Sequence, residues 1–328
     1  MTFLVIGCGS IGQRHLRNLL ALGIDVVVCD PDRIRREEVS KAYGVTVLAE
    51  LEVALSHHPE AVFICSPTST HVQLGMDISR RGHHLFIEKP LSHSSEGLDE
   101  LEREVYAHKL VAMVGCNMLF LGSLMRVKKL VEEGAIGRVL SARVQMGFYL
   151  PRWRPHMDYR TSYSANRSQG GGVLLDVIHE IGIVRWLLGE VKEVVCFSDK
   201  LSSLEIDTED VAQLLLRMAS GALVQVHFDY LQKTYRRSLE LIGEEGNLVW
   251  DFGARTVELY TGSADQWQVF RESISMDPNQ MFVDEVAHFV KCLEGGEEPR
   301  KSLSSARRDL EVILAAKRSV HERGVVRL

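Results

Sequence analysis

The chain opens with Phe3-Leu4-Val5-Ile6-Gly7-Cys8-Gly9-Ser10-Ile11-Gly12, an apolar run that leads directly into three spaced glycines. The apolar run predicts a buried strand, and residues 13–22 predict a helix. In this setting the first glycine permits a tight turn, the second lets a pyrophosphate approach the backbone, and the third allows close helix–strand packing. We therefore expect a dinucleotide at the helix N-terminus, bound by Gly7, Gly9, Ser10, Ile11 and Gly12.

A second apolar run, residues 26–29, ends in Asp30. An acid at this distance from the glycines typically accepts hydrogen bonds from the adenosine ribose. Its charge would also repel the 2′-phosphate of NADP, so the sequence favours NAD, while Arg33 and Arg35 keep NADP use open. The alternative is that Asp30 is only a turn or cap residue, since Pro31-Asp32 follows.

Strands and helices continue to alternate as far as residue 119, which marks the end of a first predicted domain. Strands are expected near residues 46–47, 61–65, 84–87 and 111–114, and helices near 32–43, 51–56, 70–81 and 94–108. This alternation predicts an α/β fold with a doubly wound parallel sheet. Ligands bind at the carboxyl ends of such strands, which is where Pro67, His71, Lys89 and Asn117 fall.

A second distinctive stretch runs from Gly170-Gly171-Gly172 into an apolar segment that contains Asp176, His179 and Glu180. A helix that is apolar all round is normally buried. Side chains three and four residues apart share a helix face, so these three are expected to point into one cavity. Buried ionisable groups are costly unless they have partners, which favours a functional cluster. The other interpretation is a satisfied core histidine with a solvent-facing acid.

The segment before these glycines, residues 151–163, is polar, aromatic and irregular. A long loop of this kind is often functional. Aromatic faces suit sugar rings, and Arg154 or Arg160 could bind a carboxylate or phosphate in a bidentate fashion. Substrate contacts are therefore expected from Trp153, Arg154, Arg160 and Tyr163. The alternative is a surface crossover with solvated arginines.

The second predicted domain, residues 120–328, is rich in strands, near 140–149, 191–198, 210–218, 222–230, 236–242, 247–251 and 256–260. Consecutive strands with tight connections indicate a large, mostly antiparallel sheet in an α+β domain, which helices at 279–293 and 303–321 complete. One sheet face should pack on the histidine helix. The other is expected to carry Leu214, Leu216, Val224 and Val226 or their neighbours, and an open apolar face usually meets a partner. We therefore expect a homodimer or homotetramer.

Composition limits the classes of function. The chain has 328 residues, 45% hydrophobic and 25% charged, with a net charge of −6, which is typical of a soluble globular protein and argues against nucleic acid as a partner. Its six cysteines show no zinc-like spacing, so reduced thiols in a cytoplasmic protein without a metal are expected. No apolar run reaches the length of a membrane span.

Five motifs, in this order, resemble those of the Gfo/Idh/MocA family of NAD(P)-dependent oxidoreductases, the glucose–fructose oxidoreductase and inositol dehydrogenase group. They are the glycine stretch 7–12, Cys65 to His71, Glu88-Lys89-Pro90, Val114 to Asn117, and Gly170 to His179. The resemblance covers essentially the whole chain and implies a Rossmann domain. It also implies that the dinucleotide is lined by Ser66, Pro67, His71, Glu88, Lys89 and Asn117, and that Lys89 and His179 lie in the active site.

Two departures from the family pattern affect the substrate. Asp176 and His179 are three residues apart rather than the usual four, and Glu180 follows, which resembles a subgroup acting on activated, nucleotide-linked or amino sugars. Leu119 replaces an arginine of the family, so one polar substrate contact is missing.

The resemblance implies oxidation of an alcohol to a ketone, or the reverse, on a sugar-like substrate. His179 would be the general base, because a carbinol releases hydride only as its hydroxyl proton is removed. Lys89 would stabilise charge on the same oxygen, and Asp176 would orient the substrate or His179. A non-catalytic redox sensor is the alternative, although a sensor needs neither Lys89 nor His179. An enzyme that recycles a tightly held cofactor is a third reading. The sugar, the reacting carbon and the direction stay open.

Overall fold

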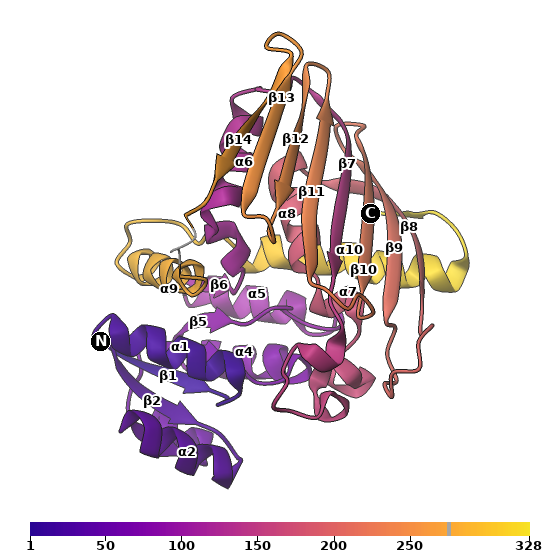
Figure 1. Ribbon diagram of the computed structural model, residues 1–328. Coiled ribbons are helices and arrows are strands. Elements are labelled where there is room, and N and C mark those ends of the chain that lie inside the picture. Colours follow the sequence, from indigo (N-terminus) through magenta and orange to yellow (C-terminus); the bar gives the residue numbers. More distant parts are fainter. Residues whose placement is uncertain (274–276) are drawn as a thin grey trace. The chain divides into compact units, whose positions relative to one another are not determined.

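The computed structural model describes residues 1–273 and 277–328, and these residues form two compact units (Figure 1). Unit 1 contains Met1–Asn117 and Pro278–Arg307, and unit 2 contains Met118–Asp277 and Arg308–Leu328. The chain first passes from one unit to the other within two residues of the predicted boundary at 119. Pro278–Arg307, however, falls in unit 1, whereas the sequence placed it in the second domain. The reason is packing, because Phe289 lies against Phe63 and Phe86 in the core of unit 1.

Unit 1 is built on a six-stranded parallel sheet in the order β3-β2-β1-β4-β5-β6. The strands are β1 (Thr2–Ile6), β2 (Asp25–Cys29), β3 (Thr46–Leu48), β4 (Ala61–Ile64), β5 (His84–Ile87) and β6 (Ala112–Val114). Strand order reverses between β1 and β4, and ligands of doubly wound sheets bind beyond the carboxyl ends of the two strands at such a reversal. The predicted doubly wound fold is confirmed.

The first five helices of unit 1 follow the strands as predicted, and α9 comes from the later segment 278–307. They are α1 (Ser10–Ala21), α2 (Arg33–Tyr43), α3 (Leu51–Leu55), α4 (His71–Ser79), α5 (Leu98–Ala107) and α9 (Gln280–Leu293), with one 3-10 turn at Thr68–Thr70. The core holds four phenylalanines, in which Phe63 and Phe86 stack with ring centroids 4.5 Å apart and Phe3 and Phe289 pack around them.

Unit 2 contains a nine-stranded sheet in the order β14-β13-β12-β11-β7-β10-β9-β8-β15, whose strands run side by side in Figure 1. The pairing is antiparallel throughout except between β7 and β10, so the predicted mostly antiparallel sheet is confirmed. The strands are β7 (Val139–Gly147), β8 (Val191–Asp199), β9 (Val211–Met218), β10 (Leu223–Asp229), β11 (Arg236–Gly243), β12 (Gly246–Asp251), β13 (Thr256–Thr261), β14 (Gln266–Arg271) and β15 (Val326–Arg327).

The helices of unit 2 differ from prediction at one important place. They are α6 (Gly122–Glu132), α7 (Val173–Asp176), α8 (His179–Leu188) and, from Arg308 onward, α10 (Leu303–Glu322). The 3-10 turns are Asn117–Phe120, Leu150–Arg152, Tyr159–Thr161, Tyr163–Ala165 and Arg167–Gln169. The single helix expected after the glycine run is broken at Val177 and Ile178. There the backbone tightens, and the backbone N–H of Glu180 donates to the carbonyl of Val177, three residues earlier.

The inner face of this sheet contacts α7 and α8, as expected. For the open face the sequence left two sets of residues open, and the first set is excluded because Leu214, Leu216, Val224 and Val226 are all buried, at 0–1% exposure. Their neighbours occupy the open face instead, including Leu215 at 61% and Leu223 at 51% exposure. Among the helices of the described residues, none combines the length and the apolar character that crossing a membrane requires.

Candidate active site

The three glycines after β1 have separate geometric roles. Gly7 has a φ of +96°, and a Cβ there would lie 2.7 Å from the carbonyl oxygen of Cys65. A Cβ on Gly12 would lie 1.8 Å from the carbonyl oxygen of Gly7, so the start of α1 packs directly on the turn. At Gly9 a Cβ would meet nothing within 4 Å. Open space therefore adjoins the loop at the N-terminus of α1. The first turn of α1 carries no acidic residue that would repel an anion. This glycine cradle, residues 7–12, fits a pyrophosphate.

Asp30 lies at the end of β2 and is 2% exposed. Its carboxylate accepts hydrogen bonds from the backbone N–H of Cys8, at 2.6 Å, and of Asp32, at 2.8 Å. The side chain therefore braces the glycine loop and also forms the turn that the alternative interpretation expected. The N–H of Cys8 is a partner that sequence reasoning missed. A carboxylate has lone pairs beyond these two bonds, so a ribose hydroxyl could still be accepted.

His71 connects the segments that follow β4 and β5. Its Nε2 lies 2.9 Å from the carbonyl oxygen of Ser66, and its Nδ1 lies 2.9 Å from that of Pro90. Burial lowers the pKa of His71 below its usual value, and a neutral imidazole donates only one hydrogen bond. His71 is 1% exposed and contacts the carbonyl of Pro90, the residue after Lys89, from the interior of unit 1. Lys89 itself is half-buried, and Pro67 is exposed.

Glu88 was expected to line the cofactor, but its carboxylate is instead part of a buried cluster. Its Oε1 lies 2.6 Å from Nε2 of His15, a fully buried residue on α1. Glu285 on α9 lies nearby and accepts a hydrogen bond from the backbone N–H of Cys116. Burial alone would raise the pKa of Glu88, but the bond to His15 and the charge of Lys89 outweigh it, so the pKa is lowered. Burial and the charge of Glu88 raise the pKa of Glu285 well above its usual value.

Packing in unit 1 also constrains two residues of the Val114 to Asn117 motif. A Cβ on Gly115 would lie 2.9 Å from Oε1 of Glu88, so any larger residue would disturb the cluster. Asn117 is almost fully buried, and its amide contacts the sulfur of Met281 at 3.2 Å. His15 and Glu285 are supporting residues that the sequence did not single out, because they lie far from Glu88 along the chain.

In unit 2, Asp176 and Glu180 point to different partners. Asp176 is 3% exposed and accepts hydrogen bonds from the hydroxyls of Tyr163 and Tyr230. Glu180, at 1% exposure, forms a buried ion pair with Nε of Arg237 at 2.5 Å. The prediction that Asp176, His179 and Glu180 point into one cavity is therefore wrong for Glu180. His179 is the first residue of α8 and is half-buried. In the sequence it lies between Asp176 and Glu180.

Three of the four expected substrate residues gather around Asp176. Tyr163 donates to it directly, Trp153 packs edge-on against the ring of Tyr230 at 5.3 Å, and the guanidinium of Arg154 lies 5.6 Å from the ring centroid of Tyr163. Arg160 does not join them. It is exposed and ion-paired with Asp158 at 2.7 Å and Glu205 at 3.0 Å, so its guanidinium has carboxylate partners of its own.

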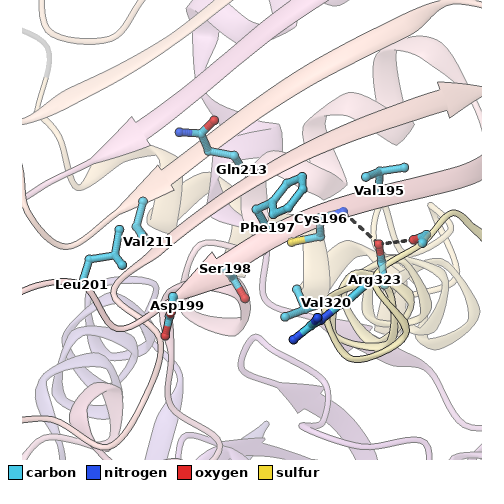
Figure 2. Close-up of a pocket in the computed structure, with 12 residues that line it drawn as sticks. Val195, Cys196, Phe197, Ser198, Asp199, Leu201, Val211, Gln213, Val320 and Arg323 are labelled. Carbon is cyan, nitrogen blue, oxygen red and sulfur yellow. Dashed lines mark hydrogen bonds between the residues drawn. The ribbon is translucent and has the colours of Figure 1, made fainter.

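Two cavities of unit 2 lie along the strands at one side of its sheet. One, of about 460 Å³, is lined by β8, β9 and the end of α10, and Figure 2 shows Phe197 and Gln213 projecting from paired positions of β8 and β9. A neighbouring cavity of about 450 Å³ includes Leu215 and Leu223. Neither contains a predicted site residue. No group of three metal-ligating side chains occurs in the part of the chain that the structure describes.

Two family models together span most of the chain. Residues 1–116 match the model described as "Oxidoreductase family, NAD-binding Rossmann fold", and residues 124–249 match the "GFO/IDH/MocA C-terminal domain". The chain belongs to the Gfo/Idh/MocA family. It is thus an oxidoreductase with an NAD-binding Rossmann domain, as the sequence predicted, and the comparisons give no support to a non-catalytic sensor.

Several relatives of this chain are named as dehydrogenases. Myo-inositol 2-dehydrogenase of Thermotoga maritima is 29% identical, over 99% of this chain and 97% of the relative. Inositol 2-dehydrogenase of Burkholderia lata is 30% identical, over 74% of this chain and 71% of the relative. The solved structure of levoglucosan dehydrogenase with NADH has a TM-score of 0.91 and covers 100% of this chain and 98% of its own, at 20% identity, which shows a shared fold.

Proposed function

We propose that this protein transfers hydride between NAD and a CH–OH carbon of a sugar-like or cyclitol substrate, in either direction. The observation that carries the proposal is the combination, in one Gfo/Idh/MocA chain, of an open glycine cradle at Gly9 and a half-buried His179 at the start of α8. Bound NAD supplies the hydride acceptor or donor. The cradle and Asp30 would hold its phosphates and ribose, and NADP remains a candidate because Arg33 and Arg35 follow.

The protein's own residues would handle the proton and the charge. His179 would take the hydroxyl proton as the carbonyl forms, from its place at the first position of α8. Lys89 would stabilise the negative charge that develops on the oxygen. Asp176 would act through the tyrosines that it holds. Residues 1–119 would thus serve the cofactor, and residues 120–328 the substrate and assembly.

The substrate is proposed from the relatives and from the loop. Both relatives are named for inositol, a ring that carries a hydroxyl on every carbon. Trp153 and Tyr163 offer aromatic surface beside Asp176, which suits such rings. Nucleotide-linked and amino sugars stay in the test panel, because Asp176, His179 and Glu180 follow the spacing of that subgroup.

Assembly and location belong to the same proposal. The open sheet face exposes Phe197, Leu215 and Leu223 at 80%, 61% and 51%, a group of large apolar side chains that a second copy would cover. We therefore propose a homodimer or homotetramer. A cytoplasmic location is supported by the six cysteines, which are all buried and form no disulfide.

The test is a substrate panel. Purified protein is mixed with NAD or NADP and with free cyclitols, free sugars, amino sugars and nucleotide-linked sugars, while nicotinamide absorbance is followed. Substrate-dependent reduction of NAD is expected, and a carbinol-deuterated substrate should slow it. The absence of turnover in both directions across the panel, with cofactor binding intact, would contradict the proposal. Release of nicotinamide on denaturing the purified protein would indicate a tightly held, recycled cofactor.

A further inference from the structure

The carboxylate of Asp176 holds two phenols at once. Oδ1 accepts the hydroxyl of Tyr163, and Oδ2 accepts that of Tyr230 at 2.8 Å. Both bonds are charge-assisted, which makes them stronger than bonds between neutral groups. Asp176 is therefore committed to orienting tyrosines on either side of it.

Tyr230 forms the fixed side of this arrangement. It is fully buried, and burial and the charge of Asp176 raise its pKa well above the usual value. The ring of Trp153 packs against it edge-on, at an interplanar angle of 89°, and the indole N–H donates to the carbonyl of Phe148 at 2.8 Å. The Tyr230 hydroxyl is thus a buried donor to Asp176.

Tyr163 forms the accessible side, and the glycine run brings it there. A Cβ on Gly171 would lie 2.1 Å from the carbonyl oxygen of Tyr163 and 2.7 Å from that of Ser164. Only glycine lets the turn at Tyr163–Ala165 lie this close to the start of α7. The ring of Tyr163 is half-buried and is flanked by the guanidinium of Arg154.

The polarity of Tyr163 follows from this geometry. A phenol has a single proton, and here that proton is donated to Asp176. Towards any other group the oxygen can only accept. We propose that Tyr163 is a specificity-determining residue that accepts a hydrogen bond from a non-reacting hydroxyl of the substrate, and that Asp176 is the positioning residue that fixes this polarity. The inference rests on the proposed polyhydroxylated substrate.

Asp176→Asn should reverse the polarity. The amide presents one acceptor and one donor group. Its oxygen should face Tyr230, because a buried tyrosine proton without an acceptor is costly. The NH₂ group would then face Tyr163, whose oxygen accepts from it and whose proton turns outward. The variant should convert Tyr163 from an acceptor into a donor towards the substrate.

The first experiment needs no substrate. Ultraviolet resonance Raman difference spectra, wild type minus Tyr163→Phe, isolate the tyrosine doublet that reports whether a phenol donates or accepts. The wild type should give the doublet of a strong donor, and the same difference in the Asp176→Asn background should give that of an acceptor. Circular dichroism confirms folding of each variant. An acceptor doublet in the wild type would overturn the inference, whatever the enzyme's activity.

The second experiment uses the best substrate of the panel with its deoxy and deoxyfluoro analogues, one hydroxyl at a time. Wild type should show a KM about tenfold lower for the parent than for one deoxy analogue, and the fluoro analogue should gain nothing because fluorine cannot donate. Tyr163→Phe should abolish this discrimination with a smaller effect on kcat, and Asp176→Asn should favour the fluoro over the deoxy analogue. Full discrimination at every hydroxyl in Tyr163→Phe would refute the inference. No turnover on the panel would instead contradict the proposed function, and the Raman result would then decide the polarity alone.

Discussion

Removing one partner of the buried Glu180–Arg237 pair should lower the free energy of unfolding by about 3–5 kcal/mol, because the charge that stays buried loses its ion-pair partner. The two side chains are 1% and 9% exposed and meet at 2.5 Å. Glu180→Leu and Arg237→Met should each show this loss. The double variant should recover most of the lost stability. Two apolar residues of similar size then replace an ion pair whose attraction mainly offsets the cost of removing both charges from water.

A matched control is available on the same strand. Arg143 and Glu240 also form an ion pair, at 2.9 Å, but their side chains are 63% and 35% exposed. Removing either partner there should cost about 0.2–1 kcal/mol. The two pairs have the same chemistry and share β11, so the comparison isolates burial.

The assay is urea unfolding followed by circular dichroism and tryptophan fluorescence at a fixed protein concentration. Coincident transitions are required before free energies are compared, since a two-unit chain can unfold in steps. A double variant less stable than either single variant would refute this description of the pair. So would a single-variant cost no larger than that of the exposed control.

Three further predictions concern the cofactor, the assembly and pH. Asp30→Ala should weaken NAD binding and narrow the gap between NAD and NADP in parallel titrations, and tighter NADP binding by wild type would contradict the assigned preference. Leu215→Glu should shift light-scattering mass towards the monomer, and a wild-type monomer at micromolar concentration would remove the proposed interface. Glu285→Gln should stabilise the protein at about pH 7 but not at about pH 4. The pKa of Glu285 is higher in the folded than in the unfolded protein, so its carboxylate costs stability once the pH rises above the unfolded pKa. Equal effects of the substitution on thermal melts at both pH values would argue against this.

The periodicity of the sequence was sufficient for most of the fold. Apolar runs of four or five residues bounded by glycine, proline or acids located β1, β2, β4, β5 and β6 within one or two residues, because those strands are largely buried on both faces. The alternation of apolar and polar residues could not show which side chains of a strand face the core where both faces of that strand are apolar. The run Leu214-Leu215-Leu216 is apolar on both faces, and only the pairing with β10 shows that Leu215 faces outward.

The chemistry of the site was less accessible to sequence reasoning. A motif marks Glu88 as important, but no single sequence could show that its partner is His15 on α1 and that Glu285 lies beside them, because such contacts depend on tertiary packing. The same limit applies to Asp176. Its place three residues before His179 suggested a shared helix face, whereas the break after α7 and the tyrosines decide where its oxygens point.

The most direct test of the central claim pairs turnover, cofactor binding and melting temperature for His179→Ala on the same samples, with Lys89→Ala alongside. If His179 is the base, turnover should fall by about 10²–10⁴-fold, while NAD binding and melting temperature stay near those of wild type. Lys89→Ala should behave similarly, and the double variant should lose less than the sum of both effects. Normal turnover in a folded His179→Ala protein would contradict the account. Activity loss that only tracked unfolding would return His179 to the role of a core histidine.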